Sequence, residues 1–436
     1  MLFRNLDLGP AEDPLAHDRR DVVEVLTAAI RGADAYAAVR RAVKLEEGVV
    51  RVGNRFVRKS KLREVAFLAV GNCAGAMARG FHDALGEVVT QGLVGGPEAP
   101  PEPWPFLFRK VTDPMLPTAE GATLAAEALE MAQGLGEKDL FVPLLSPGAL
   151  GMLASPPSGW GLPEYHELLR SIASKPTARA DLPAVAAALS PAQGGGLASA
   201  ARNVPTEALL VANGEGGRTL GASPLVPADH DRGPQARAAL ERAGLLGRVP
   251  LALRDRLAPG AASALGGRAD LHNVVIVSPG DALETAGAEA AYRKHRPRLL
   301  ELHDSSLPEM AAEKLLKAIE IHAPRASRKA GEGLALFAGV GLNVPEGGQR
   351  REVLARFLAT AQQGLSRREV TVALVYTGGS LREDLTPSGG MVDARQRFTL
   401  EKFRTKGLGV LDLAPGFTDV GAIALAYVTP QPSTRG

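Results

Sequence analysis

The chain has 436 residues, and its 50 Lys and Arg against 48 Asp and Glu leave a formal net charge of only +2. A charge this small gives no general field for attracting nucleic acid, and an aromatic content of 4% leaves few platforms on which bases could stack. The length favours two domains over a single core. One cysteine, Cys73, excludes a disulfide framework and is typical of a reducing compartment.

Targeting and membrane signals are weak throughout the sequence. The first residues lack the basic-then-apolar pattern of a secretion signal. No segment approaches the ~20 consecutive apolar residues that span a bilayer. The sequence therefore predicts a cytoplasmic protein without a membrane segment.

The first half of the chain predicts helices that alternate with buried strands. Apolar residues recur at helical spacing within 19–45. A short apolar run at 64–70 predicts a buried parallel strand, followed by a turn at 71–75 and a small-residue helix. The other elements expected here are a strand at 87–90, a loop at 95–105, a helix at 119–133 and a strand at 139–145.

The second half repeats this alternation after a weak zone of Gly, Ala, Arg and Pro at 245–270, which we interpret as the domain junction. A new strand–turn–helix unit is expected to open at 273–277, with its helix at 281–293. Further apolar strands are expected at 334–340, 370–376 and 422–428. Strands that alternate with helices are typical of parallel α/β sheets.

The most informative segment is residues 185–198, which read V-A-A-A-L-S-P-A-Q-G-G-G-L-A. It resembles the helix-and-glycine segment of the class II glycerate 2-kinases, the MOFRL-type family, which is usually close to V-R-K-H-L-S-x-I-K-G-G-R-L-A. The matching positions are Val185, Leu189, Ser190, Gly194, Gly195, Leu197 and Ala198. The family's Arg, Lys, Lys and Arg are replaced by Ala186, Ala187, Gln193 and Gly196. The apolar, serine and glycine positions of the segment are kept, but its four cations are lost. Phosphoryl transfer depends on neutralising phosphate charge, so this loss bears directly on catalysis.

The turn after the first buried strand resembles the family's G-K-A-x-x-x-M-A. Gly71 matches, but Asn72 falls on the lysine implicated in catalysis and supplies no charge. Backbone N–H groups at such a turn can hold an anion, and a plain packing turn is the alternative. A dinucleotide site is disfavoured because the G-x-G-x-x-G spacing is absent and the second strand ends in Thr90 and Gln91, not in an acid.

Two later strand ends also resemble family motifs. Residues 144–153 resemble the phosphate loop L-I-S-G-G-G-S-A-L-L with Ser146 and Gly148 kept, although Pro147 removes a backbone donor. An ordinary strand-end loop is the alternative. Residues 210–219 resemble I-S-D-V-x-G-D-D, which places Asn213 on an aspartate used for acid–base or metal-proximal work. Asparagine cannot accept the substrate's hydroxyl proton.

The second half supplies three more candidates. Glu352 matches the acid of the family's R-N-Q-E-L helix, and a solvated helix face is the alternative for it. Thr377 and Gly379 lie in a segment that resembles G-T-D-G, with Gly378 in place of Asp. The eight histidines form no ligand set, so no metal ligands are expected.

The resemblance covers roughly residues 20–430 in the correct order. It implies an α/β fold with a Rossmann-like parallel-sheet domain over 1–255 and a smaller, MOFRL-like α/β domain over 270–430. The two are expected to face each other across a cleft. The candidate residues there are Asn72 and Asn213 as catalytic positions, and Gly71, Ser146, Gly148, Ser190, Gln193, Gly194, Gly195, Glu352, Thr377 and Gly379 for substrate or nucleotide.

Three functions follow from this resemblance, which implies ATP and Mg²⁺ as cofactors. The first is a glycerate 2-kinase-like protein with reduced or lost catalysis, which binds a small organic acid or a nucleotide in the interdomain cleft or acts as a structural or regulatory partner. The second is an active kinase that makes 2-phosphoglycerate with Glu215, Arg218 or Glu352 in new roles. The third, a hydroxypyruvate reductase, has the least support. A homodimer is among the assemblies that fit, whereas nucleic acid and membrane partners are not expected.

Overall fold

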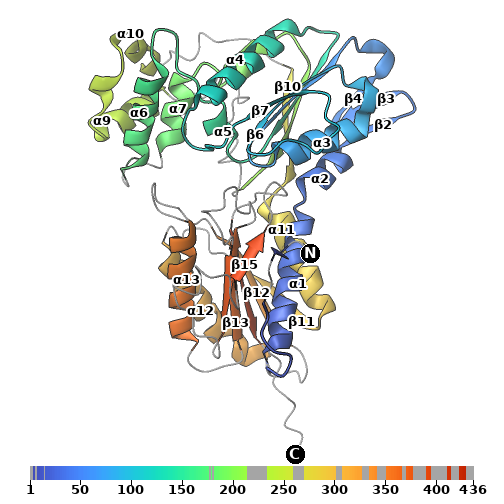
Figure 1. Cartoon of the computed structure of the whole chain (residues 1–436), viewed down its shortest axis with the longest axis vertical. Coiled ribbons are helices and arrows are strands. Elements are labelled where there is room, and N and C mark those ends of the chain that lie inside the picture. The colour runs from blue at the N-terminus through green and yellow to red at the C-terminus, as the bar shows by residue number, and fades with distance from the viewer. Residues whose placement is uncertain are drawn as a thin grey trace, which may run out of the picture. The chain divides into compact units, whose positions relative to one another are not determined.

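The structure is a computed structural model, shown in Figure 1, that divides into two compact units. One unit is Ala35–Val277, and the other combines Met1–Asp34 with Ser278–Gly436. The residues that the structure describes are 3–4, 7–13, 15–175, 178, 181–213, 233–258, 270–300, 307–326, 333–340, 350–365, 370–376, 389–393, 410–413 and 422–428.

The described part of the 35–277 unit contains a six-stranded sheet in the order β10-β9-β8-β5-β6-β7, and all its neighbouring pairs are parallel. This confirms the predicted parallel α/β fold. The central strands are buried along their whole length, as expected for parallel strands covered on both faces. The strands are β5 (Val65–Val70), β6 (Gln91–Gly96), β7 (Leu107–Lys110), β8 (Leu140–Leu145), β9 (Thr206–Val211) and β10 (Leu271–Val277).

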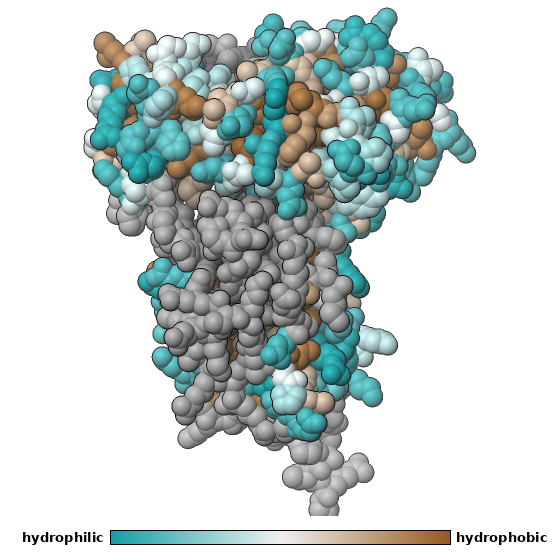
Figure 2. Space-filling model, in the orientation of Figure 1, coloured by the Kyte–Doolittle hydropathy of each residue, from teal (hydrophilic) through white to brown (hydrophobic). Residues whose placement is uncertain are grey.

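Helices cover both faces of this sheet because side chains alternate along each strand. In β5, Leu68 joins an apolar cluster with Leu124 of α4, whereas the ring of Phe67 lies 5.3 Å from that of Phe81 of α3. On the face shown in Figure 2, hydrophilic side chains cover most of the unit, with smaller apolar areas between them. The helices are α2 (Ala35–Ala42), α3 (Ala74–Leu85), α4 (Ala119–Gly134), α5 (Ala149–Met152), α6 (Leu162–Ala173), α7 (Leu182–Leu189), α8 (Gly196–Ala200), α9 (Gly233–Arg242) and α10 (Leu251–Arg254).

Two sequence-based predictions within the first 100 residues were wrong. The strand expected at 87–90 begins only at Gln91 and runs through glycines that had indicated a loop. A Cβ on Gly92 would lie 2.3 Å from the Phe67 ring, and one on Gly95 would lie 2.1 Å from Leu124, so these glycines serve close packing within a strand. The helix expected over 19–45 is two helices followed by an unpredicted sheet of β2 (Val43–Glu46), β3 (Val49–Val52) and β4 (Arg55–Arg58).

The other unit contains, among its described residues, a seven-stranded sheet in the order β1-β15-β14-β13-β16-β12-β11. Only β11 and β12 pair in parallel there. In Figure 1, α12 and α13 lie on one face of this sheet, and α1 and α11 lie side by side on the other. The strands are β1 (Phe3–Arg4), β11 (His295–Leu299), β12 (Gly333–Val340), β13 (Val370–Tyr376), β14 (Gly389–Asp393), β15 (Val410–Leu413) and β16 (Ala422–Val428). The helices are α1 (Ala16–Gly32), α11 (Pro279–Tyr292), α12 (Pro308–Ala326) and α13 (Arg350–Gly364).

The two units divide the chain differently from the expected ranges 1–255 and 270–430. Strand β10, expected to open the second domain, pairs with β9 and extends the first sheet. Helix α1 belongs to the unit that contains the C-terminal strands. Contacts between residues far apart in the sequence cause the difference, because a Cβ on Gly32 of α1 would lie only 2.1 Å from Thr285 Oγ1 of α11.

Buried polar contacts fix α1 to the sheet of its unit. Arg19, 1% exposed, donates from Nε to Asp393 Oδ2 at 2.7 Å. Asp21 accepts hydrogen bonds from Arg293 Nη1 and from the Tyr427 hydroxyl, both at 2.7 Å. Among the described helices, none combines the length and apolar character needed to cross a bilayer.

Candidate functional site

Two turns at the carboxyl ends of the neighbouring strands β5 and β8 contact each other directly. The Asn72 N–H donates to the Pro147 carbonyl at 2.8 Å, and the Cys73 N–H donates to Ser146 Oγ at 3.0 Å. Gly71 has φ +122°, and a Cβ there would lie 2.3 Å from Ser146 Oγ, so only glycine fits. The structure therefore brings Gly71, Asn72 and Ser146 together, as their strand positions predicted.

Gly148 completes this cluster at the start of α5. It has φ +92°, and a Cβ at this position would lie 2.9 Å from Asn72 Oδ1. Asn72 is only 7% exposed and Ser146 only 4%. The asparagine at the family's lysine position is thus packed into a tight turn–turn contact.

Four backbone donors of these turns make hydrogen bonds within the protein. Besides the bonds from Asn72 and Cys73, the Ala149 N–H donates to the Ser146 carbonyl at 3.1 Å, and the Ala74 N–H donates to the Gly71 carbonyl at 3.1 Å. A phosphate-binding turn needs such N–H groups to point at the ligand. These four donors are therefore directed at protein acceptors.

The segment between α7 and α8 is joined to the β8 turn region through polar side chains. Gln193, 2% exposed, donates from Nε2 to the Leu150 carbonyl, and its Oε1 is buried without a hydrogen-bond partner among the described residues. Ser190 Oγ accepts from the Ser155 N–H at 3.2 Å. Gln193 and Ser190 therefore lie next to the cluster around Ser146.

The glycines of this segment are in close contact with backbone carbonyls. Gly194 and Gly195 have φ +58° and +94°. A Cβ on Gly194 would lie 2.2 Å from the Ala187 carbonyl oxygen, and one on Gly196 would lie 1.8 Å from the Pro191 carbonyl oxygen. The arginine that the family has at position 196 has no room in this backbone.

The neutral residues at the other two cation positions are buried. Ala186 and Ala187 are 7% and 5% exposed. Ala186 belongs to an apolar cluster with Tyr165, whose phenol has a raised pKa because it is fully buried. The cluster would have to open to admit an arginine at position 186.

Asn213 is exposed, two residues after the end of β9. Because β9 runs parallel to β8 and beside it, Asn213 follows the same edge of the sheet as Ser146. Glu215 and Arg218 lie outside the described residues.

Glu352 lies on α13 of the other unit, is exposed, and accepts a hydrogen bond from Arg356 Nη2 at 2.9 Å. Thr377, Gly378 and Gly379 lie outside the described residues. A cleft between the units, with Glu352 on one wall, stays a prediction.

The sequence reasoning missed the acceptors that hold these turns. The carbonyls of Pro147 and Leu150 each accept a hydrogen bond from a neighbouring segment. A backbone carbonyl carries no signal in the residue type, so no motif could have identified them.

Comparison of the sequence with known proteins finds relatives among the glycerate kinases. A glycerate kinase of Homo sapiens is 26% identical over 272 residues, which cover 58% of this chain and 51% of that protein. An Agrobacterium vitis protein named putative hydroxypyruvate reductase is 28% identical over 178 residues, which cover 40% of this chain and 46% of that protein. The chain thus spans about half the length of these curated relatives.

A solved structure of a glycerate kinase from Thermotoga maritima has the same fold. It matches with a TM-score of 0.73 over 95% of this chain and 100% of that chain, at 17% identity. The profile of the family described as "Domain of unknown function (DUF4147)" matches residues 21–258, more than half of the sequence. The chain therefore belongs to the DUF4147 family, the family of the glycerate kinases.

Proposed function

We propose that this chain is a glycerate kinase-like protein whose phosphoryl transfer is lost or strongly reduced. The observation that carries the proposal lies at the carboxyl edge of the sheet, where the turns after β5 and β8 have neither free backbone donors at Asn72 and Cys73 nor a cation at the family's lysine position. The Asn72 and Cys73 N–H groups donate to protein acceptors, and a neutral, buried asparagine stands at the family's lysine position.

The cofactors that the family implies, ATP and Mg²⁺, are a poor match for these residues. The positions that would neutralise phosphate charge are occupied by Ala186, Gln193 and Gly196, and a Cβ at the last would meet the Pro191 carbonyl. Losing one group that stabilises the transition state costs on the order of 10³–10⁵ in rate, and several are replaced here.

The same edge suits an uncharged binding function better. The buried Gln193 Oε1 offers an acceptor that has no hydrogen-bond partner among the described residues. Amides of this kind form hydrogen bonds with hydroxyl groups without a counter-charge. The proposed ligand is a small organic acid or a nucleotide that is held through its hydroxyl groups and bound without turnover.

The test is a direct assay of the purified chain for ATP- and Mg²⁺-dependent formation of 2-phosphoglycerate from D-glycerate. A glycerate kinase of the family, assayed in parallel, is the positive control. We expect a rate at least about 10³-fold below the control. Turnover within tenfold of the control would overturn the proposal. A parallel assay of NADH or NADPH oxidation with hydroxypyruvate tests the reductase name carried by the Agrobacterium vitis relative.

Ligand binding is tested separately by thermal melting over a panel of nucleotides and hydroxy acids. A ligand that binds only the folded state raises the melting temperature in proportion to ln(1 + [L]/Kd). We expect a hydroxy acid or a nucleotide to raise the melting temperature, and Gln193→Ala to remove the shift.

Sedimentation of the same sample tests whether the chain forms a homodimer. A cytoplasmic location belongs to the same proposal and rests on the single cysteine, Cys73.

A further inference from the structure

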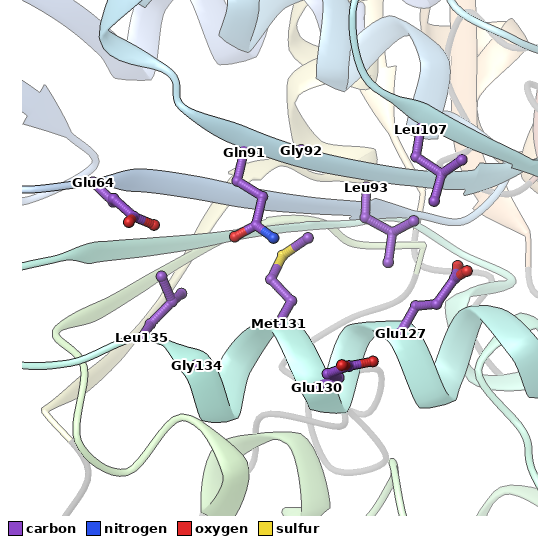
Figure 3. A pocket seen from close by; sticks show the side chains of 10 residues that line it. All are labelled: Glu64, Gln91, Gly92, Leu93, Leu107, Glu127, Glu130, Met131, Gly134 and Leu135. Atoms are coloured by element: carbon purple, nitrogen blue, oxygen red, sulfur yellow. The ribbon is translucent and has the colours of Figure 1, made fainter.

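A cavity of about 470 Å³ lies in the 35–277 unit between β6, β7 and α4 (Figure 3). Glu64 precedes β5 and Gln91 begins β6, so the cavity lies at the amino ends of these strands. Asn72 and Ser146 follow the carboxyl ends, at the opposite edge of the sheet. The volume falls within the roughly 300–1,000 Å³ that is usual for small-molecule sites.

The floor of the cavity is apolar. Leu93, Met131 and Leu135 are 2%, 9% and 5% exposed and line it. In Figure 3, Met131 extends from α4 toward Gln91 of β6, Leu93 points from β6 toward the helix beside it, and Leu107 of β7 lies near one end. A hydrocarbon chain of a few carbons would bury its surface here.

The polar side chains around this floor are three glutamates and one amide, Gln91. Glu64, Glu127 and Glu130 line the cavity, and its lining contains no lysine or arginine. Glu127 is neutralised, because Arg109 donates to it from both Nε, at 3.1 Å, and Nη2.

The other two carboxylates, Glu64 and Glu130, have no comparably close cationic partner among the described residues. The nearest guanidinium atom to Glu64 is Arg63 Nε at 3.9 Å, and that guanidinium donates to both oxygens of Asp139 instead. Glu130 has no ion pair among the described residues. The lining therefore combines an apolar floor with unneutralised negative charge.

We propose that this cavity binds a small organic cation, with its hydrocarbon part against Leu93 and Met131 and its ammonium group beside Glu130. The same carboxylates repel phosphates and carboxylic acids, so the site selects against the ligands proposed for the carboxyl edge. The inference rests on the cavity alone and is independent of the proposed kinase-like function.

The test is an NMR titration of the full chain, labelled at the methionine methyl groups, with hexylammonium, hexanol and hexanoate. We expect hexylammonium to shift the Met131 signal saturably, with a Kd on the order of millimolar for so small a ligand. Hexanol should bind more weakly and hexanoate weakest. The buried Met77 and Met152, which do not line the cavity, report any global change.

Matched variants on one helix separate charge from packing. Glu130→Gln should weaken hexylammonium about three- to fivefold and leave hexanol unchanged, as expected for one exposed ion pair. Glu120→Gln, an exposed residue in the first turn of α4 outside the lining, should change neither. Equal affinity for hexanol and hexylammonium, an unchanged Kd in Glu130→Gln, or no shift of Met131 would each overturn the proposal.

Discussion

The carboxyl ends of the strands in the 35–277 unit, which form the carboxyl edge of its sheet, and the interior of the other unit differ in charge: the first carries neutral side chains, and the second contains buried ion pairs. At the edge, neutral side chains stand where the family carries cations, and turns are held by backbone contacts around Gly71 and Gly196. In the other unit, Arg19, Asp21 and Asp393 are almost fully buried and paired. The chain can therefore bury ionised groups where they join secondary elements. Their absence at the edge is a local property of that site.

The largest effect is expected from breaking a buried pair. Arg19→Met leaves Asp393 buried without its guanidinium, which should destabilise that unit by about 3–5 kcal/mol. Hydrogen exchange of the β16 amides measures the change. Arg356→Met, in the same unit, removes an exposed helix pair with Glu352 and should cost well under 1 kcal/mol. Similar losses in both variants would show that burial does not set the contribution of these ion pairs.

Restoring a family cation at the edge should be nearly as damaging. Gly196→Arg forces a Cβ toward the Pro191 carbonyl and should destabilise its unit by about 3 kcal/mol, measured by denaturation followed through Trp160 fluorescence. Gly196→Ala should already show most of this loss, because space and not charge is limiting. Gly247→Arg is the control, since a Cβ at Gly247 has nothing within 4 Å. A tolerated Gly196→Arg would mean that the segment adapts readily.

Acid should weaken the charged interior before it affects the neutral edge. Burial lowers the pKa of His295 to about 4, against about 6.5 in the unfolded chain. Below pH 6.5 the His295 imidazole binds a proton in the unfolded state but stays neutral in the folded state, so the free energy of unfolding falls as the pH drops from about 6.5 to 4. Between pH 7 and pH 5 the loss is about 2 kcal/mol.

Hydrogen exchange of β12 and β16 at the two pH values measures this loss. The loss should be smaller in His295→Asn, which removes the titrating ring. A loss of unchanged size in that variant would assign the acid sensitivity to other groups.

The smallest effect is expected from partial repair of the site. Asn72→Lys combined with Asn213→Asp restores two family side chains but leaves Ala186, Gln193 and Gly196 neutral. We expect no measurable gain in 2-phosphoglycerate formation. A recovery within about 10³-fold of an active family member would show that these two positions alone had been limiting.

Much of the fold was predictable because buried parallel strands are continuous apolar runs. Strands β5, β8, β13 and β16 were recognised in this way. Strand β11 was missed because its sequence, H-R-P-R-L, is polar and exposed, as is typical of an edge strand. Strand β6 was missed because its glycines serve packing against Phe67 and Leu124.

The site was predictable only in outline. The order of the motifs placed Gly71, Asn72 and Ser146 at one edge, since parallel strands end on the same side. The contacts that close the turns are made by backbone carbonyls, and the unit boundary depends on α1 packing against α11. Both involve residues distant in sequence, and neither leaves a local pattern.

The membership of α1 in the unit completed by residues 278–436 has a consequence for biosynthesis. The apolar face of α1, with Val22, Val25, Leu26 and Ile30, is buried against elements that the ribosome makes only after residue 277. At about 5–20 residues per second, the intervening unit takes roughly 12–50 s to translate. For that time the α1 segment of the nascent chain lacks the elements it packs against, so it reaches its native contacts only after the whole of the 35–277 unit has been made.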